Sequence, residues 1–295
     1  MDLIESMIIG GSKPNTIRRY LFSLKAFSKF IVGSLEAQKD EQIYAAIISL
    51  MQSSNYNART KEDIKMAIKR YYKYSGRYLS LPYNRQLPST ITKEDLLDQQ
   101  DITNMLAVAP LRDKAIIQLL WETGIRPQEL LTMNVTSVNF KTGEISVNGK
   151  TGPRTIPITD LSLRFLGEYI SVFPRLFHSG KLWLPNPKSN HQGVLSEFGV
   201  LKSLRKIAAS AAISKTITIY LFRHSAATRD AVTMPEVILR QKYGWAKSSR
   251  MPEVYVHLAA RDLRQFIDDS REKERLLEQL AELKLRMSAV EAKIR

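Results

Sequence analysis

The first third of the chain repeats apolar positions with the three- and four-residue steps of an amphipathic helix. In residues 13–33 the apolar and aromatic positions are Ile17, Tyr20, Leu21, Leu24, Phe27, Phe30 and Ile31. We expect a second helix over residues 41–52 and a third from Thr60. Arg18, Arg19, Lys25 and Lys29 fall mostly off this stripe. The pattern predicts a small all-helical domain with basic faces.

Residues 135–158 follow a different pattern, in which apolar and polar positions alternate. The apolar positions are Val138, Phe140, Ile145, Val147, Ile156 and Ile158. Turn-forming residues separate them at 141–143 and 148–152. Alternation with short polar turns predicts three antiparallel strands in a meander. Lys150 is then expected at the tip of the second hairpin.

Helical patterns surround the meander, so the predicted fold class is mainly α with a small antiparallel β-meander. Helices are expected over residues 111–122, 160–177, 197–212, 223–231, 235–243 and 252–258, and in an acidic stretch that starts from Thr92. Leu81–Ser89 contains two prolines and other turn formers, which favours a linker. We therefore predict a helical domain over 1–81, a linker over 82–92, a larger domain over 93–268 and a C-terminal helix over 269–295.

The C-terminal helix carries an apolar seam spaced as in a heptad repeat over about three heptads. Its positions are Leu276, Leu280, Leu283, Met287, Val290 and Ile294. Three heptads are the minimum for such an interpretation. Two hypotheses therefore stay open, a coiled coil with another copy and a single amphipathic helix that packs on its own domain or extends into solvent.

The net charge of the chain indicates a polyanionic partner. The 295 residues have a formal net charge of +15 and a pI of about 9.8. Residues 1–85 contain 14 Lys and Arg against 7 Asp and Glu, and residues 86–268 contain 23 against 16. Basic surfaces on both parts favour a two-domain, C-shaped clamp on double-stranded DNA, with an anionic membrane surface as second choice. The DNA-binding candidates are Arg18, Arg19, Lys65, Lys69, Arg85 and Lys150.

The composition also excludes several classes of site. The chain has no Cys, which excludes disulfides and thiolate metal sites. It has no apolar run long enough to span a bilayer and no N-terminal signal pattern. We expect a cytoplasmic protein with no membrane partner.

Candidate chemistry lies in two stretches. In the first, Arg126 precedes Pro127, which is suited to the first position of a helix, and Glu129 follows where it can reach back to Arg126. An arginine at the positive end of a helix is well placed to meet an anion. The second stretch, residues 220–258, contains Arg223, a Gly-Trp pair and Tyr255. It is suited to presenting a tyrosine hydroxyl to a phosphate that cations hold.

In this order, Arg126, Lys150, Arg223, Trp245 and Tyr255 resemble the tyrosine recombinase (phage integrase) family, including its Xer-like and archaeal virus or plasmid members. The matching pieces are GIRPQELL, GKTGPRTIPI, LFRHSAAT, the Gly-Trp pair and YVHL. The resemblance covers roughly residues 90–260. It implies a site-specific DNA recombinase that assembles as a tetramer on paired sites. Residues 1–81 would be the SAM-like core-binding domain and 93–268 the catalytic domain, with no metal or cofactor.

The resemblance also implies roles for single residues. Arg126 and Arg223 would hold the non-bridging oxygens of a phosphodiester, where charge gathers in the transition state. Tyr255 would attack the phosphorus and form a 3′-phosphotyrosine. Lys150 would protonate the departing 5′ oxygen. Trp245 would donate its indole N–H to the phosphate.

Two residues complete the expected site. Glu129 would support Arg126. Tyr220 stands where the family has His three residues before the second arginine, and a phenol is a poor base near neutral pH. Either Tyr220 only orients the reactants or another group accepts the nucleophile's proton. We expect His224 and His257 to be structural, because His224 should point about 100° away from Arg223.

Two other functions stay open at this stage. A DNA-binding protein of the same fold, with impaired catalysis, would account for Tyr220. A type IB topoisomerase-like strand-passage enzyme would share the chemistry.

Overall fold

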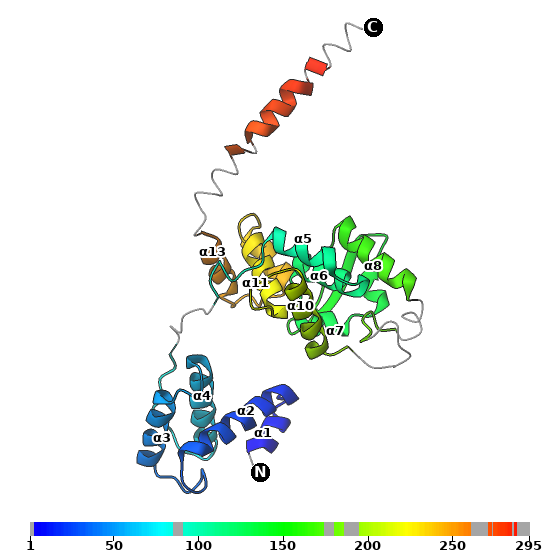
Figure 1. Cartoon of the computed structure of the whole chain (residues 1–295). Coiled ribbons are helices and arrows are strands. Elements are labelled where there is room, and N and C mark those ends of the chain that lie inside the picture. The colour runs from blue at the N-terminus through cyan, green and yellow to red at the C-terminus, as the bar shows by residue number, and fades with distance from the viewer. Residues whose placement is uncertain are drawn as a thin grey trace. The chain divides into compact units, whose positions relative to one another are not determined.

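The computed structural model describes residues 3–84, 91–173, 180–185, 195–260, 271–272, 274–284 and 286–287. The chain divides into two compact units, Met1–Thr90 and Ile91–Arg295 (Figure 1). Helices predominate in both, and the second unit contains a small antiparallel sheet. The predicted class, mainly α with a small antiparallel β-meander, is confirmed.

The first unit is all helical in its described residues. Its elements are α1 (Leu3–Ile9), α2 (Pro14–Phe27), the 3-10 helix η1 (Ser28–Phe30), α3 (Asp40–Gln52) and α4 (Ala58–Tyr74). The stripe predicted for α2 buries Phe27 against Ile43 of α3 and Ile64 of α4. Asn57 caps α4 by accepting a hydrogen bond from the backbone N–H of Thr60.

The second unit combines its sheet with helices. Its elements are α5 (Gln99–Val108), α6 (Leu111–Thr123), α7 (Pro127–Thr132), the 3-10 helix η2 (Val135–Ser137), β1 (Val138–Asn139), β2 (Glu144–Gly149), β3 (Gly152–Pro157), α8 (Asp160–Val172), α10 (Glu197–Ser210), α11 (Ile219–Asp230), α12 (Glu236–Tyr243) and α13 (Met251–Ala260). Among these helices, α7 contacts β2 and α12 contacts β3.

The meander has the predicted connectivity. The strands pair antiparallel in the order β1-β2-β3. Ile145 pairs with Val138 on one side and with Ile156 on the other, so the three apolar side chains face the same core. Gly149 and Gly152 close the second hairpin. Lys150 therefore lies at its tip, as predicted.

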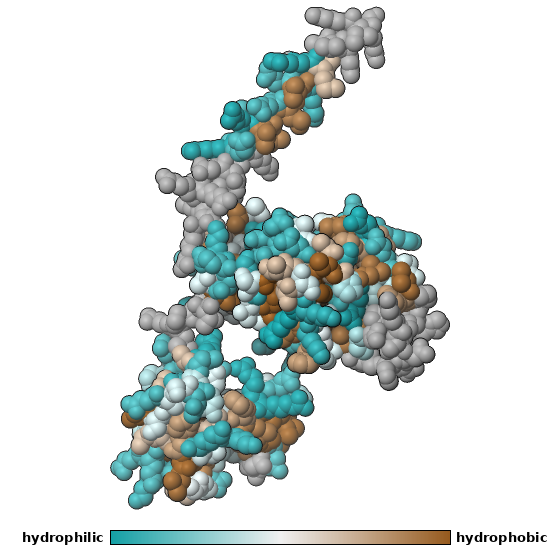
Figure 2. Space-filling model, viewed as in Figure 1, coloured by the Kyte–Doolittle hydropathy of each residue, from teal (hydrophilic) through white to brown (hydrophobic). Residues whose placement is uncertain are grey.

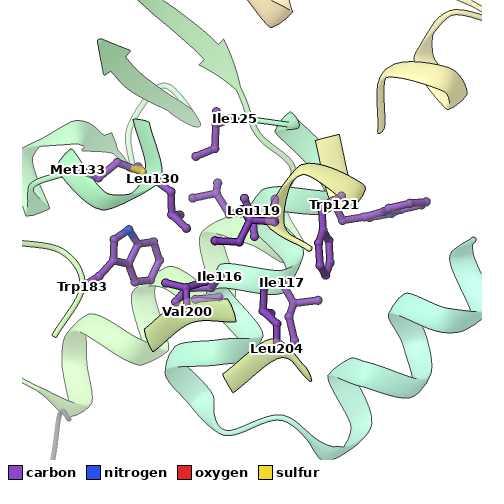
Figure 3. Close-up of a cluster of buried hydrophobic side chains, with 14 of the residues drawn as sticks. Ile116, Ile117, Leu119, Trp121, Ile125, Leu130, Met133, Trp183, Val200 and Leu204 are labelled. Atoms are coloured by element: carbon purple, nitrogen blue, oxygen red, sulfur yellow. The ribbon is translucent and has the colours of Figure 1, made fainter. Parts of the chain in front are cut away.

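Helix α6 is the centre of the main core. Ile116, Ile117, Leu119 and Leu120 are all fully buried, and α6 packs against α5, α8, α10 and α11. Figure 3 shows its side chains among residues from distant parts of the chain, including Leu130, Met133, Trp183, Val200 and Leu204. Gly124 ends α6 in the left-handed conformation, with φ +57°. The end of this buried helix therefore sets the position of Arg126, which lies directly before α7.

Two predicted helix starts were wrong. The helix expected from Thr92 begins at Gln99, because Asp98 caps it by accepting the backbone N–H of Asp101. The helix expected from residue 223 begins at Ile219, where Thr218 accepts the N–H of Leu221. The second correction places Arg223 in the interior of α11. The helix expected over 160–177 extends to Val172, and residues 174–179 lie outside the described part.

A second, smaller cluster in this unit packs the last three helices together. It contains Ala226, Ala227, Leu239, Tyr243, Tyr255 and Leu258. Small residues on α11 let α13 approach closely, so the two alanines lie against the face that carries Tyr255. The residues of 220–258 that the sequence singled out thus belong to one packed group.

The tail is helical at residues 271–272, 274–284 and 286–287. Its described seam residues, Leu276, Leu280, Leu283 and Met287, are 49–63% exposed. Figure 2 shows apolar residues following one another along this helix. Val290 and Ile294 lie outside the described residues. None of the helices in the described ranges is long and apolar enough to cross a membrane.

Candidate active site

Four functional candidates lie on helices of the second unit or directly beside them. Arg126 immediately precedes α7, and Arg223 lies within α11. Trp245 follows Gly244, which ends α12 in the left-handed conformation with φ +56°. Tyr255 lies on α13.

The two guanidiniums of Arg126 and Arg223 bind the same turn. Arg223 donates to the carbonyl oxygens of Gly124 (2.7 Å) and Tyr243 (2.6 Å). Arg126 donates to the carbonyl oxygen of Gly244 at 2.8 Å. Since residues 243 and 244 are adjacent, both side chains approach one point from different elements.

The burial of Arg223 and the nearby charge of Arg126 both affect the pKa of Arg223. Arg223 is 4% exposed. Burial, and next the charge of Arg126, lower the pKa of Arg223 to about 10. Arg223 nevertheless remains charged at neutral pH. Two cations so arranged would gain from an anion between them.

Glu129 links Arg126 to Arg154, an arginine on β3. Its carboxylate accepts from the Arg126 guanidinium at 2.9 Å and the Arg126 backbone N–H at 2.8 Å, as predicted. Arg154 donates to both oxygens of Glu129, at 2.7 and 2.8 Å, and to the carbonyl oxygen of Lys242 at 2.8 Å. A Cβ on Gly149 would lie 2.1 Å from Glu129 Oε1. The backbone of β2 therefore approaches this ion pair closely.

The charge of Glu129 is strongly stabilised. Burial acts to raise its pKa, but the hydrogen bonds and charges of Arg154 and Arg126 outweigh it and hold the pKa at about 2. Sequence reasoning missed Arg154. The available signal was that Arg154 lies two residues before Ile156, on the inward face of its strand.

Aromatic rings build one wall of the site. The ring of Trp245 stacks on Tyr243, with centroids 4.9 Å apart, and on Tyr255, with centroids 5.3 Å apart and planes 8° from parallel. The Arg223 guanidinium lies over the Tyr243 ring at 5.1 Å. The Tyr243 hydroxyl donates to Asp230 at 2.7 Å, which anchors the stack in the core.

Tyr255 is buried, at 1% exposure, and its hydroxyl lies 2.7 Å from Nδ1 of His224. Burial raises the pKa of Tyr255 to about 12, although Arg223 and Arg126 act to lower it. Our expectation that His224 is only structural overlooked this contact. His224 does follow Arg223 on α11, but α13 packs against α11 and brings the phenol to the imidazole. His257 is exposed on α13.

Comparison with known proteins shows which family the chain belongs to. Residues 91–261, more than half of the chain, match the family model described as phage integrase family. The chain belongs to the phage integrase family. Among curated relatives, it is 26% identical to tyrosine recombinase XerA of Pyrococcus furiosus over 265 residues, which cover 88% of each chain. It is 24% identical to tyrosine recombinase XerD of Staphylococcus saprophyticus, over 88% of this chain and 93% of the relative.

Solved structures of integrase-family proteins have the same fold. XerH bound to its difH substrate after cleavage aligns with a TM-score of 0.66 at 17% identity, over 86% of this chain and 80% of XerH. A lambda integrase tetramer on a Holliday junction aligns with a TM-score of 0.63 at 15% identity, over 83% of this chain and 76% of the integrase. XerA recombinase aligns with a TM-score of 0.53 at 21% identity, over 91% of this chain and 96% of XerA. At these identities the likeness concerns the fold alone.

Two further residues that the sequence predicted for the site are exposed. Lys150 is exposed at the hairpin tip and has no hydrogen bond or ion pair with any described residue. Its neighbour Thr151 donates to the carbonyl oxygen of Gly244 at 3.1 Å, so the tip is tied to the turn that both arginines bind. Tyr220, in the first turn of α11, is 49% exposed and makes no hydrogen bond within the described part.

The cations predicted to contact DNA from α2 remain at the surface of the first unit. Arg18 is exposed. Arg19 forms an exposed ion pair with Asp63 at 2.9 Å, which costs little to exchange for a phosphate. Arg85 lies outside the described residues.

The lysines predicted to contact DNA from α4 are differently placed. Lys65 is 8% exposed, and its ammonium donates to the buried Glu62 at 2.7 Å. The charge of Lys65 is therefore already paired inside the unit, and its contact with DNA stays a prediction. Lys69 is partly buried and donates to the carbonyl oxygen of Leu81 at 3.0 Å.

Proposed function

We propose that this chain is a site-specific DNA recombinase that cleaves and rejoins strands through a 3′-phosphotyrosine. One observation carries the proposal. Arg126 and Arg223 bind adjacent carbonyls of the turn at Tyr243-Gly244, and Tyr255 stacks on the tryptophan that follows this turn. Cationic donors and a phenol nucleophile are thus held by the same few residues.

The arginines would stabilise the transition state. A guanidinium has five N–H donors, and each of the two arginines uses part of its set on described residues. The remaining donors would bind the non-bridging oxygens, where negative charge increases as Tyr255 attacks. Because the backbone and Glu129 already hold these side chains, little reorganisation is needed during the reaction.

The remaining groups would complete the exchange. Lys150, on the hairpin tip that Thr151 ties to the site, would donate a proton to the departing 5′ oxygen. Trp245 would donate its indole N–H to the phosphate. Tyr255 contacts the tryptophan and histidine of its own chain, which favours cleavage by each subunit with its own tyrosine.

The larger assembly is also part of the proposal. The core-binding domain (1–81) and the catalytic domain (93–268), joined by residues 82–92, would form a C-shaped clamp on duplex DNA in the cytoplasm. Both carry excess positive charge. A tetramer on paired sites is supported by the lambda integrase tetramer bound to a Holliday junction, which shares the fold. The exposed seam of 269–295 would add contacts between copies.

A covalent-capture experiment tests the activity. The chain is incubated with a pool of nicked suicide duplexes that have a randomised core, and DNA that stays bound after denaturation is sequenced. We expect an enriched site with the wild-type chain and no captured DNA with Tyr255→Phe. Tight binding without capture would instead indicate a DNA-binding protein that has lost catalysis. Relaxation of supercoiled plasmids that lack any such site would indicate a topoisomerase.

A further test isolates the leaving-group role of Lys150. Lys150→Ala should slow cleavage, and a 5′-bridging phosphorothiolate should restore it, because a thiolate leaves without a proton. If the phosphorothiolate gives no recovery, Lys150 does not serve as the acid.

A further inference from the structure

A phenol must lose its proton before or while it attacks phosphorus. Burial makes this harder for Tyr255, whose pKa of about 12 leaves very little phenolate at neutral pH. Tyr220, at the position where an imidazole was expected, is a weak base and half-exposed. The site therefore needs another proton acceptor within hydrogen-bonding distance of Tyr255.

His224 is in that position. Its Nδ1 lies 2.7 Å from the Tyr255 hydroxyl, and the two rings pack with centroids 5.7 Å apart. His224 projects from α11, directly after Arg223, so the same helix holds the phosphate-binding guanidinium and the imidazole. A phenol held between Trp245 and His224 has little freedom to rotate away.

We propose that His224 accepts the phenolic proton of Tyr255 as the tyrosine oxygen bonds to phosphorus. The O–H bond of Tyr255 breaks and its proton passes to Nδ1 of a neutral His224, whose own proton is on Nε2. The new O–P bond displaces the 5′ oxygen of the DNA strand, which takes its proton from Lys150. In the rejoining step the 5′ hydroxyl attacks phosphorus and gives its proton back to Lys150, and the imidazolium of His224 protonates the departing oxygen of Tyr255. The assignment rests on the proposed function.

The surrounding charges are compatible with this exchange. The cations near the contact are Arg223 on α11 and Arg126 before α7, and Tyr255 faces it from α13. Burial, and next the Arg223 charge, lower the pKa of His224, which favours the neutral imidazole that can accept a proton. Bound phosphate places a negative charge beside the arginines. It would offset their repulsion of the imidazolium when the proton arrives.

Two variants distinguish proton transfer from orientation. Asn places Oδ1 where His224 has Nδ1, so His224→Asn keeps the hydrogen bond to Tyr255 but cannot take the proton. His224→Leu removes both. We measure single-turnover cleavage of the captured site and expect both variants to be at least about 100-fold slower than wild type. His257→Asn, the same substitution at an exposed position on α13, is the matched control and should cleave at the wild-type rate.

The pH dependence of the cleavage rate supplies a second readout of the same proton transfer. Wild-type cleavage should fall about tenfold per pH unit on the acid side, where His224 becomes protonated, and His224→Asn should lack this limb. An acid limb that persists unchanged in His224→Asn, or His224→Asn cleaving as fast as wild type, overturns the assignment while leaving the recombinase proposal intact. If the wild-type chain captures no DNA, both proposals fall.

Discussion

The carboxylate of Glu129 joins Arg126, Arg154 and the backbone before α7, so its neutralisation is the most informative single change. Glu129→Gln keeps the size of the side chain and removes its charge. Because Glu129 is only 1% exposed, water cannot replace the interactions that the variant loses. The variant should therefore destabilise the second unit and loosen Arg126.

The magnitude follows from the pKa. Arg154 and Arg126 outweigh the opposing effect of burial and lower the pKa of Glu129 from 4.5 to about 2. At 1.36 kcal/mol per pKa unit, this corresponds to about 3 kcal/mol of stability at neutral pH. Because the pKa of Glu129 is lower in the folded than in the unfolded protein, its charge stabilises the fold fully at pH values above the unfolded pKa. This stabilisation is lost as the pH falls toward the folded pKa. The difference between wild type and Glu129→Gln should therefore shrink to about 2 kcal/mol at pH 3.5.

Urea unfolding followed by tryptophan fluorescence measures this difference. The three tryptophans, Trp121, Trp183 and Trp245, are all in the second unit, so the signal reports the unit that contains Glu129. Glu168→Gln is the control, because the ion pair of Glu168 with Arg164 is exposed and long, at 3.8 Å. It should change stability by less than about 0.5 kcal/mol.

Two results would refute the reasoning. The first is a loss of less than about 1 kcal/mol in the free energy of unfolding of Glu129→Gln at pH 7, which would mean that the carboxylate contributes little net stability. The second is an equal loss at pH 7 and pH 3.5. The effect would then arise from altered packing and not from the charge.

Three further outcomes are expected. Tyr243→Phe removes the donor to Asp230 and should lower unfolding free energy by about 1–2 kcal/mol in the fluorescence assay; no change would show that this bond is energetically neutral. Gly244→Ala should lower the free energy of unfolding by more than about 1 kcal/mol and slow cleavage, because φ at this residue is +56° and an added Cβ would lie 2.9 Å from Arg154 Nη1. A variant as stable as wild type would contradict this crowding. Arg18→Ala should reduce the slope of log K for DNA binding against log salt by about 1, and an unaltered slope would remove Arg18 from the DNA contacts.

The local elements of this fold could be predicted because their signals are contained in short stretches. The sheet follows from alternating residues around two turns, and the pairing of Ile145 with Val138 and Ile156 agrees with it. The contact between Arg126 and Glu129 was predictable for the same reason, since the two residues are three apart at a helix start. Helix boundaries were less certain, and the cap at Thr218 was missed.

Which charged residues point inward could not be predicted in the same way. Lys65 looks like one more cation on a basic helix, yet it pairs with Glu62 inside the first unit. Arg154 looks like a residue of an exposed hairpin, yet it binds a carboxylate 25 positions away in the chain. Glu62 is three residues before Lys65 on α4, so helical spacing brings the two together, but only the fold decides that the pair is buried. The contact between Arg154 and Glu129 depends on the fold alone.

The sequence by itself determined the order of the reactive side chains and the helices and strands that carry them, because these depend on residues a few positions apart. Only the tertiary structure decided that guanidiniums from residues 126 and 223 meet at one turn, and that the phenol of Tyr255 meets His224. The reason is that burial of α13 against α11 sets these distances, and such burial depends on how whole faces fit together.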